Sequence, residues 1–271
     1  MKRLIFGSGK VSNIIKKPSD IVIKREECDI RDLDTVVRIF HTHMPEVVIN
    51  CAAKTNLEWC QENKKETYDV NTQGPINLFL ACKMFQVKLV HISSGCLFDG
   101  NDKLSTEEST PTPSVWYTWT KTWADQFIQN EGYENYLILR PRQLISAKAH
   151  PSNMITKFAS FEEIGGIEEQ NSVTCIEDFS DMIDHLIQKD EKGIFNCCNT
   201  GTLSPYKIAC DVRDFIAPNM KVSKVSYESL LERLPNRRVN TILSSKKLSE
   251  TGYTPRSAQD ALAWCLENYN E

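Results

Sequence analysis

Short apolar segments that alternate with amphipathic helical segments constrain the fold of this chain more than any other feature of the sequence. The predicted strands lie at residues 3–6, 21–23, 45–53, 88–93 and 136–140. The predicted helices lie at residues 33–43, from about 57, at 74–86 and at 117–130. No β-hairpin turn signal joins consecutive strands. The alternation therefore predicts an α/β protein with a doubly wound parallel sheet.

The regular alternation loosens after residue 141, which indicates a second domain. A chain of 271 residues is long enough for one large or two modest domains. We predict a first domain at residues 1–145 and a second, smaller domain at 146–271, with segment 173–198 returning to the first. The second part is predicted to hold a helix at 153–161, strands at 173–176 and 193–197, a helix at 178–188, and three helices within 206–269.

Composition argues against several classes of function. A net charge of −4 disfavours binding to nucleic-acid phosphates, and no apolar run approaches the ~20 residues that span a bilayer. The ten cysteines lack Cys-x-x-Cys metal spacing, and the apolar start is too short for a secretory signal. We therefore expect reduced thiols in a cytoplasmic protein, with no metal, nucleic-acid or membrane partner.

A glycine-containing turn at residues 7–12 directly follows the first predicted strand. Gly7 and Gly9 permit a tight turn and the close approach of a pyrophosphate, and Ser12 is small enough for the place of a third glycine. The next helix is expected to be short, because Pro18 follows two lysines. The turn favours a Rossmann dinucleotide site, with an ordinary strand–helix turn as the alternative.

The end of the second predicted strand carries cations. Lys24 and Arg25 stand where a fold that selects NAD usually has an acidic residue for the ribose diol. A cation at this position favours the 2′-phosphate of NADP, and a solvated strand end is the alternative. We predict NADPH/NADP⁺ as the cofactor.

Four polar side chains suit acid–base chemistry at a carbonyl. Tyr117 and Lys121 are four residues apart, so they share one face of a helix. Ser94 and Cys96 are two apart at a predicted strand end, so we expect both on one side of the sheet. Lys121 is expected to lower the pKa of Tyr117 by stabilising its phenolate. His91, within the apolar strand, is predicted to be a core residue rather than a base.

These motifs together resemble the extended short-chain dehydrogenases/reductases, and within them the dTDP-4-dehydrorhamnose reductase group. The resemblance rests on the Gly-x-Gly turn, residues 50–53, Asn71, Ser94 and the Tyr117–Lys121 pair. More narrowly, residues 56–60, 91–98 and 153–157 resemble the plant and viral UDP-rhamnose synthases. Those enzymes are 3,5-epimerase/4-reductases that act on UDP-4-keto-6-deoxyglucose. The resemblance covers nearly the whole chain.

The turn and the resemblance together imply a set of site residues. The cofactor is expected to contact Gly7, Ser8, Gly9, Lys10, Val11, Arg25, Asp29, Ile30, Cys51, Ala52, Ala53, Lys54, Asn71, Tyr117 and Lys121. The nucleotide sugar is expected to contact Ser94, Cys96, Asn153 and Arg238. The expected catalytic residues are Ser94, Cys96, Tyr117, Lys121 and Lys157.

The resemblance assigns epimerisation to Cys96 and Lys157. The protons at C3 and C5 of the sugar flank the C4 ketone and are acidic through an enolate, and inversion requires a base on one face and an acid on the other. A thiol with a pKa near ~8.5 is close enough to neutrality for this work. The alternatives are a small buried hydrophobic residue for Cys96 and a solvated helix lysine for Lys157.

The sequence thus predicts a bifunctional enzyme that uses NADPH to convert UDP-4-keto-6-deoxy-D-glucose to UDP-L-rhamnose. The alternatives are a 4-reductase alone, acting on a dTDP- or UDP-linked 4-keto-rhamnose, and a non-catalytic subunit of this fold, like the regulatory β subunit of methionine adenosyltransferase. We also expect a homodimer, because relatives pair the helices at 74–86 and 117–130 across a twofold axis. We expect those helices to carry more apolar residues than one face buries internally: Leu78, Phe79, Cys82, Trp123 and Phe127.

Overall fold

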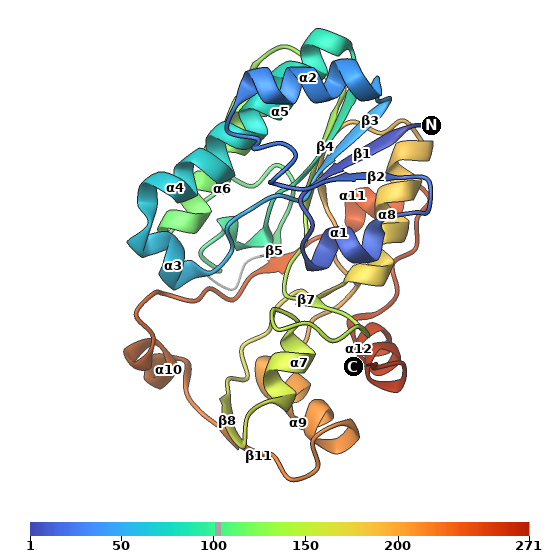
Figure 1. Cartoon of the computed structure of the whole chain (residues 1–271). Coiled ribbons are helices and arrows are strands. Elements are labelled where there is room, and N and C mark those ends of the chain that lie inside the picture. The colour runs from blue at the N-terminus through green and yellow to red at the C-terminus, as the bar shows by residue number, and fades with distance from the viewer. Residues whose placement is uncertain (101–103, 271) are drawn as a thin grey trace. The chain divides into compact units, whose positions relative to one another are not determined.

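The computed structural model describes residues 1–100 and 104–270 (Figure 1). A six-stranded sheet with the order β10-β6-β4-β3-β1-β2 forms its centre. The strands are β1 (Arg3–Phe6), β2 (Ile21–Ile23), β3 (Val47–Asn50), β4 (Lys88–Ile92), β6 (Tyr136–Arg140) and β10 (Gly193–Asn196). The pairs β1–β2, β1–β3, β3–β4 and β4–β6 are parallel. The predicted doubly wound α/β fold is confirmed.

Helices connect these strands, and α5 packs on both α2 and α6 (Figure 1). The helices are α1 (Lys10–Ile15), α2 (Leu33–His43), α3 (Leu57–Glu62), α4 (Lys64–Tyr68), α5 (Gly74–Phe85) and α6 (Trp116–Asn130), with a π-helical turn at Asp69–Gln73. Helix α2 shows why the sequence folds this way: the Asp32 carboxylate accepts from the backbone N–H groups of Asp34 and Thr35, and Val36 and Phe40 enter the core.

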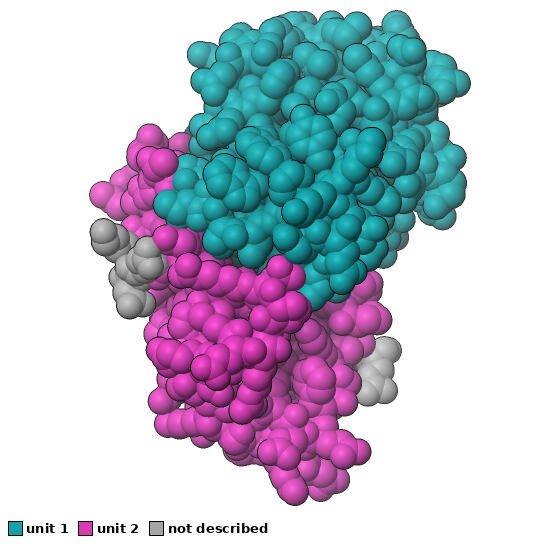
Figure 2. All heavy atoms as spheres, turned by 90° about the vertical axis from the view of Figure 1, so that its left-hand side faces the viewer, with its two compact units in different colours: residues 1–97, 111–140, 186–195 teal, residues 98–110, 141–185, 196–271 magenta. Residues whose placement is uncertain are grey.

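Two compact units divide the chain (Figure 2). Unit 1 comprises residues 1–97, 111–140 and 186–195, and unit 2 comprises residues 98–110, 141–185 and 196–271. The partition differs from the predicted domains at 1–145 and 146–271. The returning segment is 186–195 instead of 173–198, and 98–110 belongs to unit 2. The reason is strand pairing, since β5 (Leu104–Ser105) pairs with β12 (Ile242–Leu243) far along the chain.

Unit 2 has its own core and three two-stranded sheets, β11–β8, β12–β5 and β7–β9. Its remaining strands are β7 (Leu144–Ile145), β8 (Glu163–Gly166), β9 (Thr174–Cys175) and β11 (Lys221–Lys224). Its helices are α7 (Met154–Ala159), α9 (Pro205–Phe215), α10 (Tyr227–Arg233), α11 (Lys246–Glu250) and α12 (Ala258–Glu267), and α8 (Ile176–Gln188) begins in it. Residues 206–269 were predicted to hold three helices. The described structure has four there, because α11 is a five-residue helix with little apolar periodicity.

Two further observations bear on the expectations from composition. None of the helices in residues 1–100 and 104–270 combines the length and the apolarity needed to cross a bilayer. All ten cysteines are free thiols, and most are buried.

Candidate functional site

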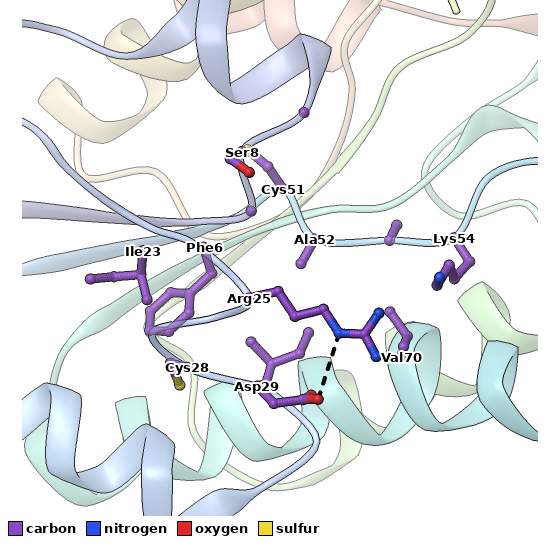
Figure 3. Close-up of a pocket in the computed structure, with 14 residues that line it drawn as sticks. Phe6, Ser8, Ile23, Arg25, Cys28, Asp29, Cys51, Ala52, Lys54 and Val70 are labelled. Carbon is purple, nitrogen blue, oxygen red and sulfur yellow. Dashed lines mark ion pairs between the residues drawn. The ribbon is translucent and has the colours of Figure 1, made fainter.

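A pocket of about 260 Å³ opens beyond the carboxyl ends of β1, β2 and β3 (Figure 3). Its lining comes entirely from unit 1: Phe6, Gly7, Ser8, Gly9, Ile23, Arg25, Cys28, Asp29, Ile30, Cys51, Ala52, Ala53, Lys54 and Val70. Ten of these residues belong to the predicted cofactor set. This edge of a parallel sheet is where α/β folds bind ligands.

Gly7 lines the pocket in a backbone conformation that favours glycine. Gly7 has a φ of +99°, and a Cβ added there would meet the Ala52 backbone nitrogen at 2.9 Å. Both facts require glycine at this position. A Cβ on Gly9 would meet nothing within 4 Å, so the turn is open on that side. The two loops therefore form a close cradle with space for a flat or phosphorylated ligand.

Five residues of the predicted cofactor set lie outside the pocket lining: Lys10, Val11, Asn71, Tyr117 and Lys121. Asn71 acts on the pocket indirectly. Its buried amide donates to the Lys54 carbonyl at 2.8 Å and accepts from the Lys54 backbone N–H at 2.8 Å. It thereby holds the loop that carries Ala52 to Lys54 in place.

Charge at the mouth of the pocket is mixed. Arg25 forms an ion pair with Asp29 (Figure 3), in which its Nε lies 3.8 Å from an Asp29 oxygen. Its Nη2 lies 3.7 Å from a Glu66 oxygen. Asp29 is also bound by Arg31, whose hydrogen bonds lower the pKa of that carboxyl. The Arg25 side chain is 54% exposed, so an anion in solvent can reach its guanidinium. Lys24 does not line the pocket.

Sequence reasoning missed four lining residues, Phe6, Ile23, Cys28 and Val70. The first two end β1 and β2, and a rule that assigns the last residue of each parallel strand to the ligand edge finds them. Cys28 and Val70 have no comparable signal, because loop and helix packing bring them to the pocket.

The second group of predicted residues lies around the end of β4. The prediction that Ser94 and Cys96 share one face of a strand is wrong, because β4 ends at Ile92 and a 3₁₀ turn occupies Gly95–Leu97. The Ser94 hydroxyl oxygen instead accepts from the Cys96 backbone N–H at 3.1 Å. This side-chain bond closes the turn and keeps Ser94 and Cys96 close together.

Tyr117 of α6 lies beside both residues. It is 8% exposed, and its hydroxyl lies close to Ser94. Burial raises the pKa of Tyr117, the nearby Cys96 raises it further, and the polar Ser94 side chain lowers it. The net pKa lies above its ordinary value, contrary to the predicted lowering, because removal from water outweighs the nearby polar groups.

Lys121 is fully buried one helical turn beyond Tyr117. Its Nζ donates to the Ile92 carbonyl at 2.8 Å and lies 3.3 Å from His91 Nε2. Burial lowers the pKa of Lys121 to about 8, while Asp125 and Cys51 raise it. Since Cys51 also lines the pocket, Lys121 lies near the inner end of the predicted cofactor site.

The predicted residues of unit 2 have other surroundings. Asn153 caps α7: its side-chain oxygen accepts from the Ile155 backbone N–H, and its amide donates to the carbonyls of Ser146 and Lys148 at 2.8 and 2.9 Å. Lys157 is exposed on α7. Arg238 is partly buried, and its carbonyl accepts from the Tyr227 hydroxyl. The roles predicted for these residues in substrate binding and epimerisation stay predictions.

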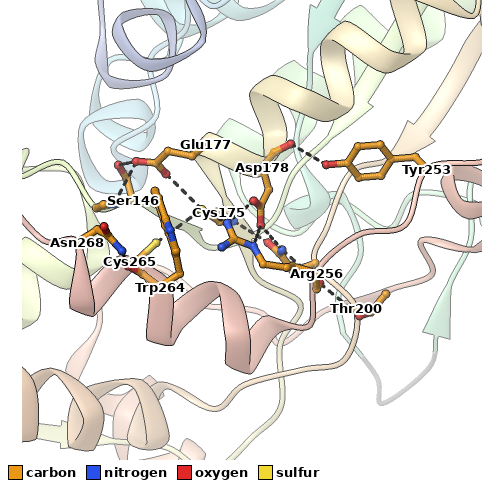
Figure 4. A network of polar contacts seen from close by, with 12 residues as sticks. Ser146, Cys175, Glu177, Asp178, Thr200, Tyr253, Arg256, Trp264, Cys265 and Asn268 are labelled. Carbon is orange, nitrogen blue, oxygen red and sulfur yellow. Dashed lines mark hydrogen bonds and ion pairs between the residues drawn. The ribbon is translucent and has the colours of Figure 1, made fainter.

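A polar cluster in unit 2 brings together Cys175, Cys265 and Glu177, with ligand atoms within 4.8 Å of one another (Figure 4). Cys175 lies 3.6 Å from the Cys265 sulfur and 3.2 Å from a Glu177 oxygen, so a chain of S–H bonds satisfies the group without a cation. The Arg256 guanidinium, held by Asp178, lies 4.0 Å from the Cys175 sulfur and opposes a bound metal ion. We assign this cluster to the core of unit 2.

The parallel sheet, the Gly7 turn and the Ser94–Tyr117–Lys121 group define an extended short-chain dehydrogenase/reductase. The chain belongs to the family described as RmlD substrate binding domain, whose model matches residues 11–271. The resemblance inferred from the motifs is confirmed.

Known proteins similar to this chain include two plant enzymes and one bacterial structure. A trifunctional UDP-glucose 4,6-dehydratase/UDP-4-keto-6-deoxy-D-glucose 3,5-epimerase/UDP-4-keto-L-rhamnose-reductase of Arabidopsis thaliana is 26% identical over 266 residues, which are 92% of this chain and 39% of that enzyme. A bifunctional dTDP-4-dehydrorhamnose 3,5-epimerase/dTDP-4-dehydrorhamnose reductase of the same plant is 29% identical over 231 residues, which are 81% and 75% of the two chains. A dTDP-4-dehydrorhamnose reductase of Bacillus anthracis in complex with NADP superposes with a TM-score of 0.88, at 25% identity, over 98% of this chain and 99% of that one.

Proposed function

We propose that this protein is an NADPH-dependent reductase of a nucleotide-linked 4-keto-6-deoxy sugar. One observation carries the proposal: the buried Tyr117 hydroxyl, close to Ser94 and one helical turn from Lys121, lies in the same unit as the pocket. The names of the bifunctional plant relative and the bacterial reductase support it.

The pocket suits NADPH, a dinucleotide that carries a 2′-phosphate. The Gly7 turn admits close backbone approach, and Arg25 is an exposed cation at the mouth that suits a 2′-phosphate. Asp29 and Glu66, which now neutralise Arg25, compete with that contact. When bound, NADPH supplies the hydride that reduces the ketone carbon. The Ala52 to Lys54 loop, held by Asn71, is proposed to pack against it.

Tyr117 is proposed to protonate the ketone oxygen. Its raised pKa keeps the phenol protonated at neutral pH, which is the form that a general acid needs. Ser94 is proposed to hydrogen-bond the same oxygen and hold it polarised. The Lys121 ammonium is proposed to stabilise the phenolate that Tyr117 becomes when it gives up its proton.

We further propose that the enzyme is bifunctional and inverts C3 and C5 before reduction, so that UDP-4-keto-6-deoxy-D-glucose becomes UDP-L-rhamnose. Cys96 is the candidate base or acid on one face, since its turn places it beside Tyr117. Lys157 of α7 is the candidate on the other face. The epimerase activities in the names of both plant relatives support this assignment.

Parallel incubations test the whole proposal, one with UDP-4-keto-6-deoxy-D-glucose and the others with an already epimerised UDP- or dTDP-linked 4-keto-rhamnose. The protein is mixed with UDP-4-keto-6-deoxy-D-glucose and NADPH, and the sugar product is identified by NMR. UDP-L-rhamnose supports the bifunctional enzyme, and turnover only of an already epimerised 4-keto-rhamnose supports the reductase alone. If the protein oxidises NADPH with neither sugar, whether UDP- or dTDP-linked, the enzyme proposal fails. A non-catalytic subunit then takes its place.

The expected homodimer and cytoplasmic location remain proposals. The prediction that α5 and α6 carry more apolar surface than they bury internally is wrong for Leu78, Phe79 and Cys82, which are fully buried within unit 1. The large hydrophobic residues exposed on these two helices are Met84 and Trp119. A dimer is proposed to use that smaller surface, and light scattering at micromolar concentration tests it, with a monomer mass as the contrary result.

A further inference from the structure

His91 is fully buried on β4, and its tautomer follows from its neighbours. Asn50 is its partner across the β3–β4 pair. The Asn50 oxygen accepts from the Ala52 backbone N–H at 3.0 Å, so the Asn50 amide nitrogen faces His91 Nδ1 at 3.1 Å. That nitrogen can only donate, so Nδ1 must accept. Burial and the Lys121 charge hold the pKa of His91 well below its ordinary value, so the ring is neutral and carries its proton on Nε2.

The Nε2–H group faces two side chains of α6. Lys121 Nζ lies at 3.3 Å and Asp125 Oδ1 at 3.8 Å. An ammonium cannot accept a hydrogen bond, whereas an uncharged amine can. Asp125 Oδ1 is buried, and no described donor satisfies it within hydrogen-bond distance. The Nε2–H group therefore has one acceptor when Lys121 is uncharged and another, slightly farther away, when it is charged.

We propose that His91 is a positioning residue for Lys121. The Nε2–H group of His91 stabilises the uncharged Lys121 amine, and it donates to Asp125 Oδ1 instead when the amine is protonated. This inference rests on the proposed function, in which Lys121 assists Tyr117. It makes Lys121 a group that titrates near working pH. Loss of the Lys121 proton then removes the charge that stabilises the Tyr117 phenolate, and activity falls on the alkaline side.

The other charged and titratable groups around this pair are few. Asp125 lies on the same helix as Lys121, and its second oxygen accepts from the Ser93 hydroxyl at 2.7 Å and lies 3.6 Å from the Arg140 guanidinium of β6. Cys51, which follows β3, raises the pKa of Lys121. The Nε2–H of His91 is the donor that lies 3.3 Å from the Lys121 amine.

Matched variants test the proposal through the pH profile of kcat/KM for the reduction. His91→Met has similar length but no donor, whereas His91→Gln keeps an N–H donor at its far end. Without the donor, the uncharged amine loses stabilisation, so the alkaline limb in His91→Met should move up by roughly half to one pH unit. His91→Gln should restore the wild-type limb. A uniform loss of rate in both variants with an unmoved limb would overturn the proposal.

Nitrogen-15 NMR of histidine-labelled protein gives a readout that needs neither activity nor a folded variant. His91, one of five histidines, should be an Nε2–H tautomer, and its ring signals should follow a titration with a midpoint near the Lys121 pKa of about 8. An Nδ1–H tautomer, or ring signals that do not change with pH, would overturn the inference. If Tyr117→Phe still reduces the sugar at the wild-type rate, the proposed function fails, and the NMR result still judges the role of His91.

Discussion

The two units of this protein hold their predicted functional residues in opposite ways. In unit 1, Tyr117 and Lys121 are buried and have pKa values displaced from their ordinary ranges. The Lys121 Nζ also donates to the Ile92 carbonyl. In unit 2, Lys157 is exposed, and the Asn153 side chain is committed to capping a helix. The comparison teaches that the residues proposed for reduction are organised within one unit. The proposed epimerisation also needs Lys157, whose side chain is exposed on unit 2.

The largest effect is expected for Tyr117→Phe, which removes the proposed proton donor of unit 1. Reduction should fall by ~10²–10⁴-fold, as for the loss of a general acid. Exchange of the C3 and C5 protons should persist, because it uses other residues. NADPH oxidation and NMR of the sugar recovered from D₂O without NADPH measure the two steps. Loss of both steps, with an unchanged melting temperature, would mean that the steps share Tyr117.

Cys96→Ala and Lys157→Ala test the proposed epimerisation. Each should slow exchange at C3, C5 or both by about 10²-fold or more, and leave only slow reduction of the unepimerised ketone. Cys96→Ser should behave like Cys96→Ala, because a hydroxyl has too high a pKa to act as the base at neutral pH.

Lys221→Ala, at another exposed lysine of unit 2, is the matched control for Lys157→Ala and should leave exchange unchanged. Wild-type exchange in both Cys96→Ala and Lys157→Ala would leave the reductase alone as the function. In that case unit 1 would hold the reductase site, and the predicted residues of unit 2 would have only structural roles.

A moderate effect is expected at the pocket mouth. Arg25→Ala should lower kcat/KM for NADPH by roughly ten- to hundredfold, the worth of one charge-assisted contact to the 2′-phosphate, and leave kcat/KM for NADH unchanged. Lys24→Ala is the control from the same strand end and should change little, since Lys24 does not line the pocket. Equal losses with both cofactors would show that Arg25 supports the pocket and does not read the phosphate.

The smallest effect on catalysis is expected for Asn153→Ala. Loss of the α7 cap and of the bonds to the Ser146 and Lys148 carbonyls should lower the free energy of unfolding by about 2 kcal/mol. Urea denaturation measures this change, and kcat/KM of the folded protein should stay at the wild-type value. A raised KM for the nucleotide sugar without a loss of stability would instead make Asn153 a substrate contact.

Most of the sheet and its helices could be predicted, because local patterns suffice for them. Helix α2 begins at an Asp32 cap and follows a 3.6-residue apolar period, and Pro18 explains why α1 is short. The Gly7 turn was predicted from its glycines, and Gly7 has a φ of +99° in the structure. These features depend on residues within a few positions of one another.

The sequence by itself determined the order of strands and helices, the glycine turn and the Tyr117–Lys121 spacing, since each is a local property of the chain. Only the tertiary structure decided what those residues experience. Burial of α6 reversed the predicted direction of the Tyr117 pKa shift. Pairing of β3 with β4 joined Asn50 to His91, which are far apart in sequence, and so fixed a proton on the nitrogen that faces Lys121. Desolvation and tautomer depend on atoms that folding gathers from distant segments, and no local pattern contains them.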